Sequence, residues 1–400
     1  MTQYKNQHFL PQFYLRRFSD DRVGLCRYSL SDEITERSNI ERTCARFYFY
    51  AGSALAEEWE TTFSRLEMKH AEIIQEILDQ RNLSMFSAQG ANPEDVLQDY
   101  LFLCNFILLT AARTELKKKE LHEIANWAFD LMKEGIAQSE EAKTRGITKE
   151  DLDRLELRRD TANLESIENA LLGPILISDL APVLIINETD NPFITSDSPT
   201  ILYNFLKLGD LGMLGWQSPG LMLLLPLSEE IMIGLFDPDI YLLNINALQR
   251  TLTLTRKQDV DEINRLQVLN ADEYLIFSKL DYNDYVSSLH KPLKNRLRET
   301  FTHKEKKAEF QAEGKQHAFY MTRNVGINYK PHLSFLKINK ARVEQYKNAF
   351  REQIAPKLQA AEFRRGMPPR IMRNEALFES FLATKENIMK KIASQESDGV

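Results

Sequence analysis

The residues most able to do chemistry near the amino end lie in residues 6–19, NQHFLPQFYLRRFS, which carry one histidine, two arginines and four aromatic side chains. Imidazole titrates near neutral pH without a perturbed environment, so His8 could serve as a general acid or base. Pro11 favours a short helix, on which Tyr14 and Phe18 would share a face. A structural role, in which a hydrogen bond from His8 caps this helix, explains the same residues.

A carboxylate much later in the chain is the second candidate. Asp197 lies in FITSDSPTIL, at the expected end of a strand and two residues before Pro199. It could bind a metal ion or orient His8, as strand-end acids do in many nucleases. It could equally form an Asx turn by accepting backbone N–H bonds. No acid-x-Lys element follows it, so the standard restriction-type nuclease motif is not visible.

Two glutamates and two arginines extend this set. Glu60 and Glu67 are seven residues apart in a helical pattern, which places them on one face about 10 Å apart along the axis. Carboxylates this far apart cannot chelate one ion directly, so each is expected to pair with an arginine such as Arg113. Arg113 ends a largely apolar helix, where a guanidinium needs a carboxylate or phosphate partner. Arg17 would lie near His8 if the chain folds back.

The charge of the chain is uneven. The net charge is −7 at pH 7, but residues 291–373 hold 20 Lys and Arg against 7 Asp and Glu, a local charge of +13 that leaves −20 for the rest. Such a segment can bind a polyanion, or equally dock on the acidic body of its own chain. The proline-glycine break RRGMPPRIMR within it carries four arginines as candidates for nucleic-acid binding: Arg364, Arg365, Arg370 and Arg373.

The composition predicts a folded protein without a membrane span. At 43% hydrophobic residues, 400 residues can form one large core or two ordinary ones. The longest apolar runs, at 101–112 and 220–227, are shorter than the roughly 20 residues that cross a bilayer. Residues 1–12 lack the pattern of a secretion signal, so we expect a cytoplasmic protein. Three widely spaced cysteines predict reduced, mostly buried thiols: Cys26, Cys44 and Cys104.

The period of the apolar residues predicts an α+β fold with a mixed sheet. Residues 1–50 are β-rich, and the helical period of about 54–172 predicts a large helical insert. Strand and turn patterns over about 181–285 predict a sheet with a helix on it. We therefore expect residues 1–285 to form one core domain. Residues 286–400 are expected to form a basic, mostly helical C-terminal segment.

Residues 6–19 resemble the opening signature of domain-of-unknown-function family 4238, a run of the form His-x-x-Pro-x-x-Tyr-Leu-x-x-Phe. Further segments resemble the family in the same order up to about residue 280, among them WETTFSRLE, FITSDSP and INRLQVLNADEYLIFS. The resemblance implies a link to bacterial anti-phage defence, hence a toxic or interfering effector, without implying its chemistry. It points to six residues as marks of the family, whether structural or catalytic: His8, Tyr14, Glu60, Glu67, Asp197 and Asn264.

Several common catalytic motifs are absent from the sequence. It contains no GxxxxGK[ST] phosphate loop, GxGxxG, HExxH or GxSxG. Their absence disfavours ATP hydrolysis, Rossmann redox chemistry, zinc proteolysis and serine-hydrolase chemistry. An enzyme here would use groups that are scattered along the chain.

The leading hypothesis is a defence effector that acts on DNA or RNA as a nuclease. His8 and Asp197, with Tyr14 and Glu67, would be its catalytic residues, and Arg17 or Arg113 would stabilise charge on the phosphate, with Mg²⁺ as a suitable cofactor. The alternative is a non-enzymatic sensor that recognises a phage protein or nucleic acid. A third class is an enzyme that modifies a host protein or a nucleotide. The long amphipathic helices are compatible with a homo-oligomer and with packing inside one subunit.

Overall fold

The computed structural model describes residues 6–344, except 48, 50–52, 87–92, 156–161, 208–214, 217, 299–301 and 313–314. Their fold is α+β with a mixed sheet, as the sequence predicts. The first elements are short: β1 (Asn6–His8), α1 (Gln12–Leu15), β2 (Gly24–Ser29), β3 (Thr35–Asn39) and β4 (Ala45–Phe47).

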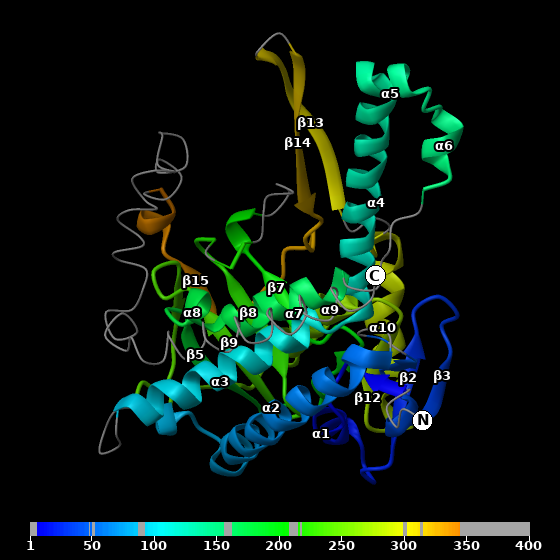
Figure 1. Ribbon diagram of the computed structural model, residues 1–400. Helices are drawn as coiled ribbons and strands as arrows, with labels where there is room; N and C mark the ends of the chain where they lie inside the picture. The colour runs from blue at the N-terminus through cyan, green and yellow to red at the C-terminus, as the bar shows by residue number, and fades with distance from the viewer. Residues whose placement is uncertain are drawn as a thin grey trace.

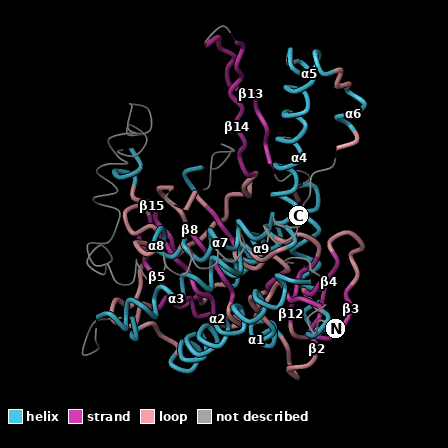
Figure 2. Tube along the Cα trace, viewed as in Figure 1, coloured by secondary structure: helices cyan, strands magenta, loops and turns pink. Residues whose placement is uncertain are grey.

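A five-stranded sheet with the order β11-β5-β9-β8-β7 forms the centre of the molecule (Figures 1 and 2). Its strands are β5 (Ala181–Asn187), β7 (Ile201–Tyr203), β8 (Met222–Pro226), β9 (Ile231–Phe236) and β11 (Thr251–Leu254). β11 pairs with β5 in parallel, and the other neighbours are antiparallel. Every residue of β8 and β9 is buried, because both faces of the sheet are covered.

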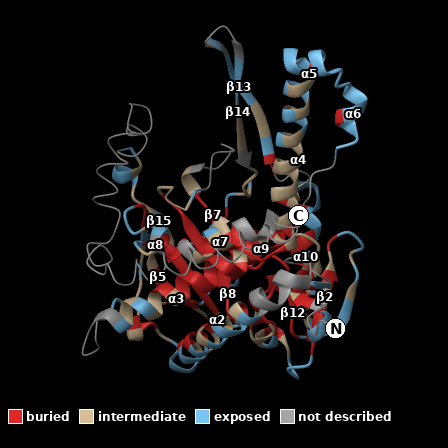
Figure 3. Ribbon diagram, viewed as in Figure 1, coloured by how far each residue is buried: buried red, intermediate tan, exposed pale blue. Residues whose placement is uncertain are grey.

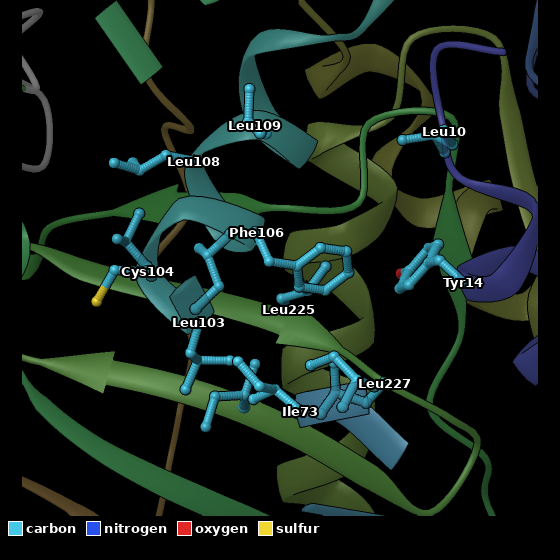
Figure 4. Close-up of a cluster of buried hydrophobic side chains, with 14 of the residues drawn as sticks. Leu10, Tyr14, Ile73, Leu103, Cys104, Phe106, Leu108, Leu109, Leu225 and Leu227 are labelled. Atoms are coloured by element: carbon cyan, nitrogen blue, oxygen red, sulfur yellow. The ribbon is translucent and has the colours of Figure 1, made fainter. Parts of the chain in front are cut away.

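Each face of this sheet belongs to a different hydrophobic cluster, because alternate residues of a strand point to opposite faces. Leu184 and Ile233 pack with the helices of the predicted insert, and Ile185 and Met232 pack with α9 (Lys257–Asn270). Figure 3 shows the buried centre, and Figure 4 shows Phe106 among the leucines of the first cluster. The covering helices are α2 (Ser53–Gln80), α3 (Pro93–Ala112), α7 (Ala162–Leu172) and α8 (Pro174–Ile177).

Helix α3 is the central helix of this layer. Its window Asp95–Ala112 is long and apolar enough to cross a membrane, but 56% of that window is buried inside the molecule. It packs against α2, α7 and α8, as the core helix of a folded domain does. The three cysteines are free and buried, which confirms the expectation of buried thiols.

A second, antiparallel sheet has the order β3-β2-β12-β6. It includes β6 (Thr195–Ser196) and β12 (Tyr274–Phe277), and α10 (Asn283–His290) packs on it. β1 pairs with β4, so the opening segment lies beside residues 45–47. Another pair joins β10 (Tyr241–Leu243) to β15 (Leu336–Ile338). The segments 286–297 and 327–343 thus pack on the same core as the residues before them.

Two elements project from this body side by side, α4 (Glu115–Gln138) and the hairpin of β13 (Thr302–Ala312) and β14 (Lys315–Asn324) (Figure 1). We call α4 and this hairpin the arm. Lys304 Nζ lies 3.2 Å from Glu123 Oε1, and the rings of Trp127 and Tyr320 are 5.7 Å apart, edge to face. The short helices α5 (Glu140–Arg145) and α6 (Lys149–Asp153) follow α4.

The hairpin corrects one expectation from the sequence. The lysine-rich segment after residue 285 was expected to be mostly helical, but residues 302–312 and 315–324 form two paired strands. Their contacts with α4 and the ten cross-strand partners outweigh local helix propensity. The candidate arginines of the basic segment lie outside the described residues: Arg364, Arg365, Arg370 and Arg373.

Replacing Trp127 by alanine should loosen the hairpin without unfolding the body. The edge-to-face pair with Tyr320 contributes about 0.5–1.5 kcal/mol beyond its buried area, and the described residues of the hairpin have few other contacts with α4. Hydrogen exchange followed by mass spectrometry should therefore show faster exchange in β13 and β14 and unchanged exchange in β8 and β9. Unchanged exchange in the hairpin would show that α4 does not support it.

Candidate functional site

Three of the predicted residues come together beside the first strand. Arg113, which directly follows α3, donates from Nη1 to Glu67 Oε1 at 2.8 Å and from Nη2 to the backbone oxygen of His8 at 3.0 Å. Because Glu67 belongs to α2, one guanidinium joins the amino-terminal strand to both long helices. We call these residues, with Gln12 and Glu41, the N-terminal polar cluster.

His8 is half-buried in this cluster, with Nε2 at 3.0 Å from the backbone oxygen of Glu41. Two contacts of Nε2 make opposite demands, because the Glu41 carbonyl oxygen only accepts and the Gln12 amide nitrogen, at 3.3 Å, only donates. We assign the proton to Nε2 because the contact with the carbonyl is the shorter one, which leaves Nδ1 unprotonated in the neutral ring. Burial lowers the pKa of His8, against the raising effects of the Glu41 carbonyl and the Glu67 charge. At neutral pH the imidazole is therefore uncharged, which is the form that a general base requires.

Arg113 has the carboxylate partner that the sequence predicts for it. Its side chain is 4% exposed, against 27% for Glu67, and its guanidinium carbon lies 3.9 Å from the centre of the Phe63 ring. Hydrogen bonds and the aromatic face replace water around the buried charge. These contacts give Arg113 a structural role, and its binding to a nucleic-acid phosphate stays a prediction.

Tyr14 connects the opening segment to the strand that precedes Asp197. Its buried hydroxyl lies 2.6 Å from Thr195 Oγ1, and burial raises its pKa, so the phenol stays protonated. The ring packs on Phe18, as expected for a short helix begun by Pro11. Arg17 instead donates to Gln75 on the surface of α2.

Asp197 follows β6 and is 5% exposed. Its carboxyl oxygens accept from the backbone N–H groups of Asp272, Glu273 and Tyr274 at 2.9, 2.7 and 3.1 Å. Burial and the charge of Asp272 raise its pKa to about 7, and the three N–H donors oppose this. Within the described residues, the hydrogen bonds of Asp197 all go to this one turn and none goes to His8. The carboxylate therefore binds the start of β12, which resembles the Asx-type role more than that of a catalytic partner.

Asn264 holds backbone groups in place, as Asp197 does. Asn264 is fully buried and accepts from Ile194 N while donating to Pro192 O, at 3.1 and 2.8 Å. The side chain of Glu60 lies outside the part that can be described. Among the described residues, no three His, Cys, Asp or Glu side chains are grouped so that they could hold a metal ion. A Mg²⁺ ion at this site stays a prediction.

The comparisons with known proteins identify the family. A family model described as a protein of unknown function (DUF4238) matches residues 6–281. The chain belongs to this family. No curated protein and no solved structure matches the chain. The residues that this family model covers include the N-terminal polar cluster and Asp197.

A row of buried amides was missed in the sequence. Asn264, Gln267 and Asn270 recur every three residues on α9, and each is less than 7% exposed. Gln267 donates to Ser196 Oγ at 2.6 Å, and Asn270 donates to the backbone oxygens of Ser198 and Thr200. This row holds the segment that carries Asp197. Amide residues at a regular three-residue spacing, interleaved with the apolar residues of the same helix, were the available signal.

Proposed function

We propose that this protein is an anti-phage effector that cleaves nucleic acid, with the N-terminal polar cluster as its reaction centre. The observation that supports it best is the meeting of a neutral imidazole, a carboxylate and a guanidinium at His8, Glu67 and Arg113. Phosphodiester cleavage needs a base for the nucleophile and positive charge beside the phosphate. The three groups supply these types of side chain in one place.

In this mechanism His8 is the base, and Nδ1 takes the proton from the attacking water or hydroxyl. The resulting imidazolium is stabilised by the negative charge of Glu67, which already raises the pKa of His8. Arg113 orients Glu67 and holds the strand of His8 in place. Asp197 contributes only by fixing β12 and has no part in proton transfer.

The test is a cleavage assay with plasmid DNA, total RNA and tRNA, each with Mg²⁺ and with a chelator. His8→Asn and Glu67→Gln should lower the cleavage rate by about 10²- to 10⁴-fold, the range for the loss of one general acid or base. His303→Asn and Glu76→Gln are matched controls, because both wild-type residues are exposed and lie outside the cluster. Circular dichroism and thermal melting should show that all four variants are folded.

Two results would end this proposal. One is the absence of cleavage of any substrate by the wild-type protein under every condition. The other is full activity in both cluster variants, which would show that the imidazole and the carboxylate are not required. Equal losses in the variants and their controls would point to instability rather than to lost catalysis.

A non-enzymatic sensor is the second candidate, and the arm favours it. Met132 and Phe319 are 51% and 55% exposed, on α4 and β14 respectively, although large apolar side chains are usually buried. Such a surface suits a protein partner such as a phage component. Changing both residues to serine should abolish binding to this partner if the sensor model is correct, while nucleic-acid cleavage should be unaffected.

A further inference from the structure

A cavity of about 140 Å³ lies at the base of the arm, and none of its lining residues belongs to the N-terminal polar cluster. Its walls come from segments far apart in the sequence: the start of α4, the turn between β6 and β7, the end of α9, and the chain on both sides of the hairpin. Arg298 and Val325 contribute from these two sides of the hairpin. Both lie beyond residue 281, so the wall of the cavity includes residues that the family model covers and residues that it does not cover.

Three polar side chains in its wall have hydrogen-bonding capacity that no described residue uses: Ser166, Ser198 and Asn270. Asn270 is 6% exposed, and the two short bonds of its Nδ2 go to backbone oxygens, which assigns this atom as the nitrogen. Its Oδ1 accepts no hydrogen bond from any residue that the structure describes. The hydroxyl of Ser166, 9% exposed, likewise has no bond to a described residue, and Ser198 Oγ only accepts a long bond from Asn270. Asn270 Oδ1 and Ser166 Oγ are not fully enclosed by protein, so each can form a hydrogen bond with the polar edge of a ligand in the cavity, and the Ser198 hydroxyl can donate to it.

The cavity also carries more positive than negative charge. Glu120 Oε2 lies 2.9 Å from Lys117 Nζ, and Glu120 Oε1 lies 3.9 Å from Arg298 Nη1. One carboxylate therefore faces two cations. Arg298 is 12% exposed and donates to the backbone oxygens of Asn270 and Val325, which fixes it in the wall. This arrangement favours a ligand with an anionic end.

The rest of the wall is apolar, with an indole among aliphatic side chains: Leu108, Leu116, Leu202, Trp216 and Ile327. A dry apolar cavity of about 150 Å³ holds one benzene molecule, so this volume suits one ring system. A purely apolar ring would leave Asn270, Ser166 and Ser198 unpaired. A planar heteroaromatic ring with donors and acceptors on its edge satisfies both parts of the wall, and nucleobases have this chemistry.

We propose that this cavity binds one nucleobase, with its phosphate near Arg298 and Lys117. Asn270 Oδ1 accepts from an amino or ring N–H group of the base, and the hydroxyls of Ser166 and Ser198 donate to a ring nitrogen or carbonyl. The base can come from a free nucleotide or from a single strand of DNA or RNA. The inference rests on the proposed function for the choice of nucleic acid, but base binding requires no cleavage.

Isothermal titration calorimetry of the whole chain tests it with AMP, GMP, CMP and UMP, with ribose 5-phosphate, and with eight-residue homo-oligonucleotides. At least one mononucleotide should bind, and ribose 5-phosphate should bind at least tenfold more weakly. A mononucleotide that binds better than its oligonucleotide identifies a free nucleotide as the ligand, and the reverse identifies a strand. No binding of any base, or equal binding of ribose 5-phosphate, overturns the proposal.

Two variants connect the binding to the cavity. Ala111→Trp, which fills the space from the half-buried wall, should remove binding, and Ser166→Ala should weaken it on the order of tenfold by removing one hydrogen bond. Ser288→Ala is the control, because this serine is exposed and outside the cavity. Unchanged affinity in Ser166→Ala and Ala111→Trp would place the base elsewhere. Base binding without any cleavage would contradict the reaction centre alone, whereas cleavage without base binding would contradict this cavity alone.

Discussion

Replacing Asp197 by alanine is expected to destabilise the folded protein by about 3–5 kcal/mol. The carboxyl group accepts three backbone N–H bonds at the start of β12, and the side chain is 5% exposed. Alanine would leave these donors without a partner in a site that water does not easily reach, and each unpaired buried donor costs about 1–3 kcal/mol. The loss should appear as a lower midpoint in urea unfolding with an unchanged slope.

Asp197→Asn and Asp281→Ala are the matched comparisons for this measurement. Both oxygens of Asp197 accept backbone N–H groups, and asparagine keeps one of these acceptors while its Nδ2 cannot accept, so asparagine retains only part of the hydrogen bonds. The asparagine variant should therefore lose less stability than the alanine variant. Asp281 is exposed, and its loss should change little. A stability loss below about 1 kcal/mol in Asp197→Ala would contradict the structural role.

This outcome decides how activity data on Asp197 are interpreted. A partly unfolded Asp197→Ala protein loses any function, so an activity loss in that variant is no evidence for catalysis. His8→Asn and Glu67→Gln are sharper probes of chemistry, because their side chains are more exposed and hold fewer backbone groups. A nuclease that depends on Asp197 for chemistry would lose more activity in Asp197→Asn than the stability loss of that variant explains.

The sequence predicts those parts of the fold that have a local signature. Apolar periodicity identifies α2 and α3 and the strands of the central sheet, because burial of one face repeats at the period of the element. The pairing of Glu67 with Arg113 was also predictable, since a cation at the end of an apolar helix needs a carboxylate. The shared face of Tyr14 and Phe18 follows from helix geometry.

Features made by distant segments have no such signature. Asp197 binds backbone N–H groups of residues 272–274, and a backbone donor is the same in every sequence. The hairpin of β13 and β14 contradicts its lysine-rich composition, because its contacts, between the two strands and with Trp127 of α4, join residues that are apart in the sequence. The cavity at the base of the arm needs at least four segments at once. The sequence feature that best indicates this cavity is Asn270, one of three evenly spaced amide residues on α9.

Acid should weaken the protein through His70. This side chain is 2% exposed on α2, its ring packs near Phe102 and Phe106 of α3, and Nε2 donates to Asn105 Oδ1 at 3.1 Å. Burial lowers its pKa from 6.5 to about 3. Below pH 6.5 the unfolded chain binds a proton that the folded protein does not, so stability is present above this pH and falls as the pH decreases towards 3.

The expected loss is about 1.4 kcal/mol per pH unit, or about 2 kcal/mol at pH 5. Other groups also titrate in this range, including Asp179, whose pKa burial raises to about 6. The measurement therefore compares the wild-type protein with His70→Gln by urea unfolding at pH 7.5 and pH 5. The stability advantage of the wild-type protein should shrink by about 2 kcal/mol between the two pH values. His303→Gln, at an exposed histidine, should show no such change, and a constant difference for His70→Gln would mean that this imidazole binds a proton in the folded protein as readily as in the unfolded chain.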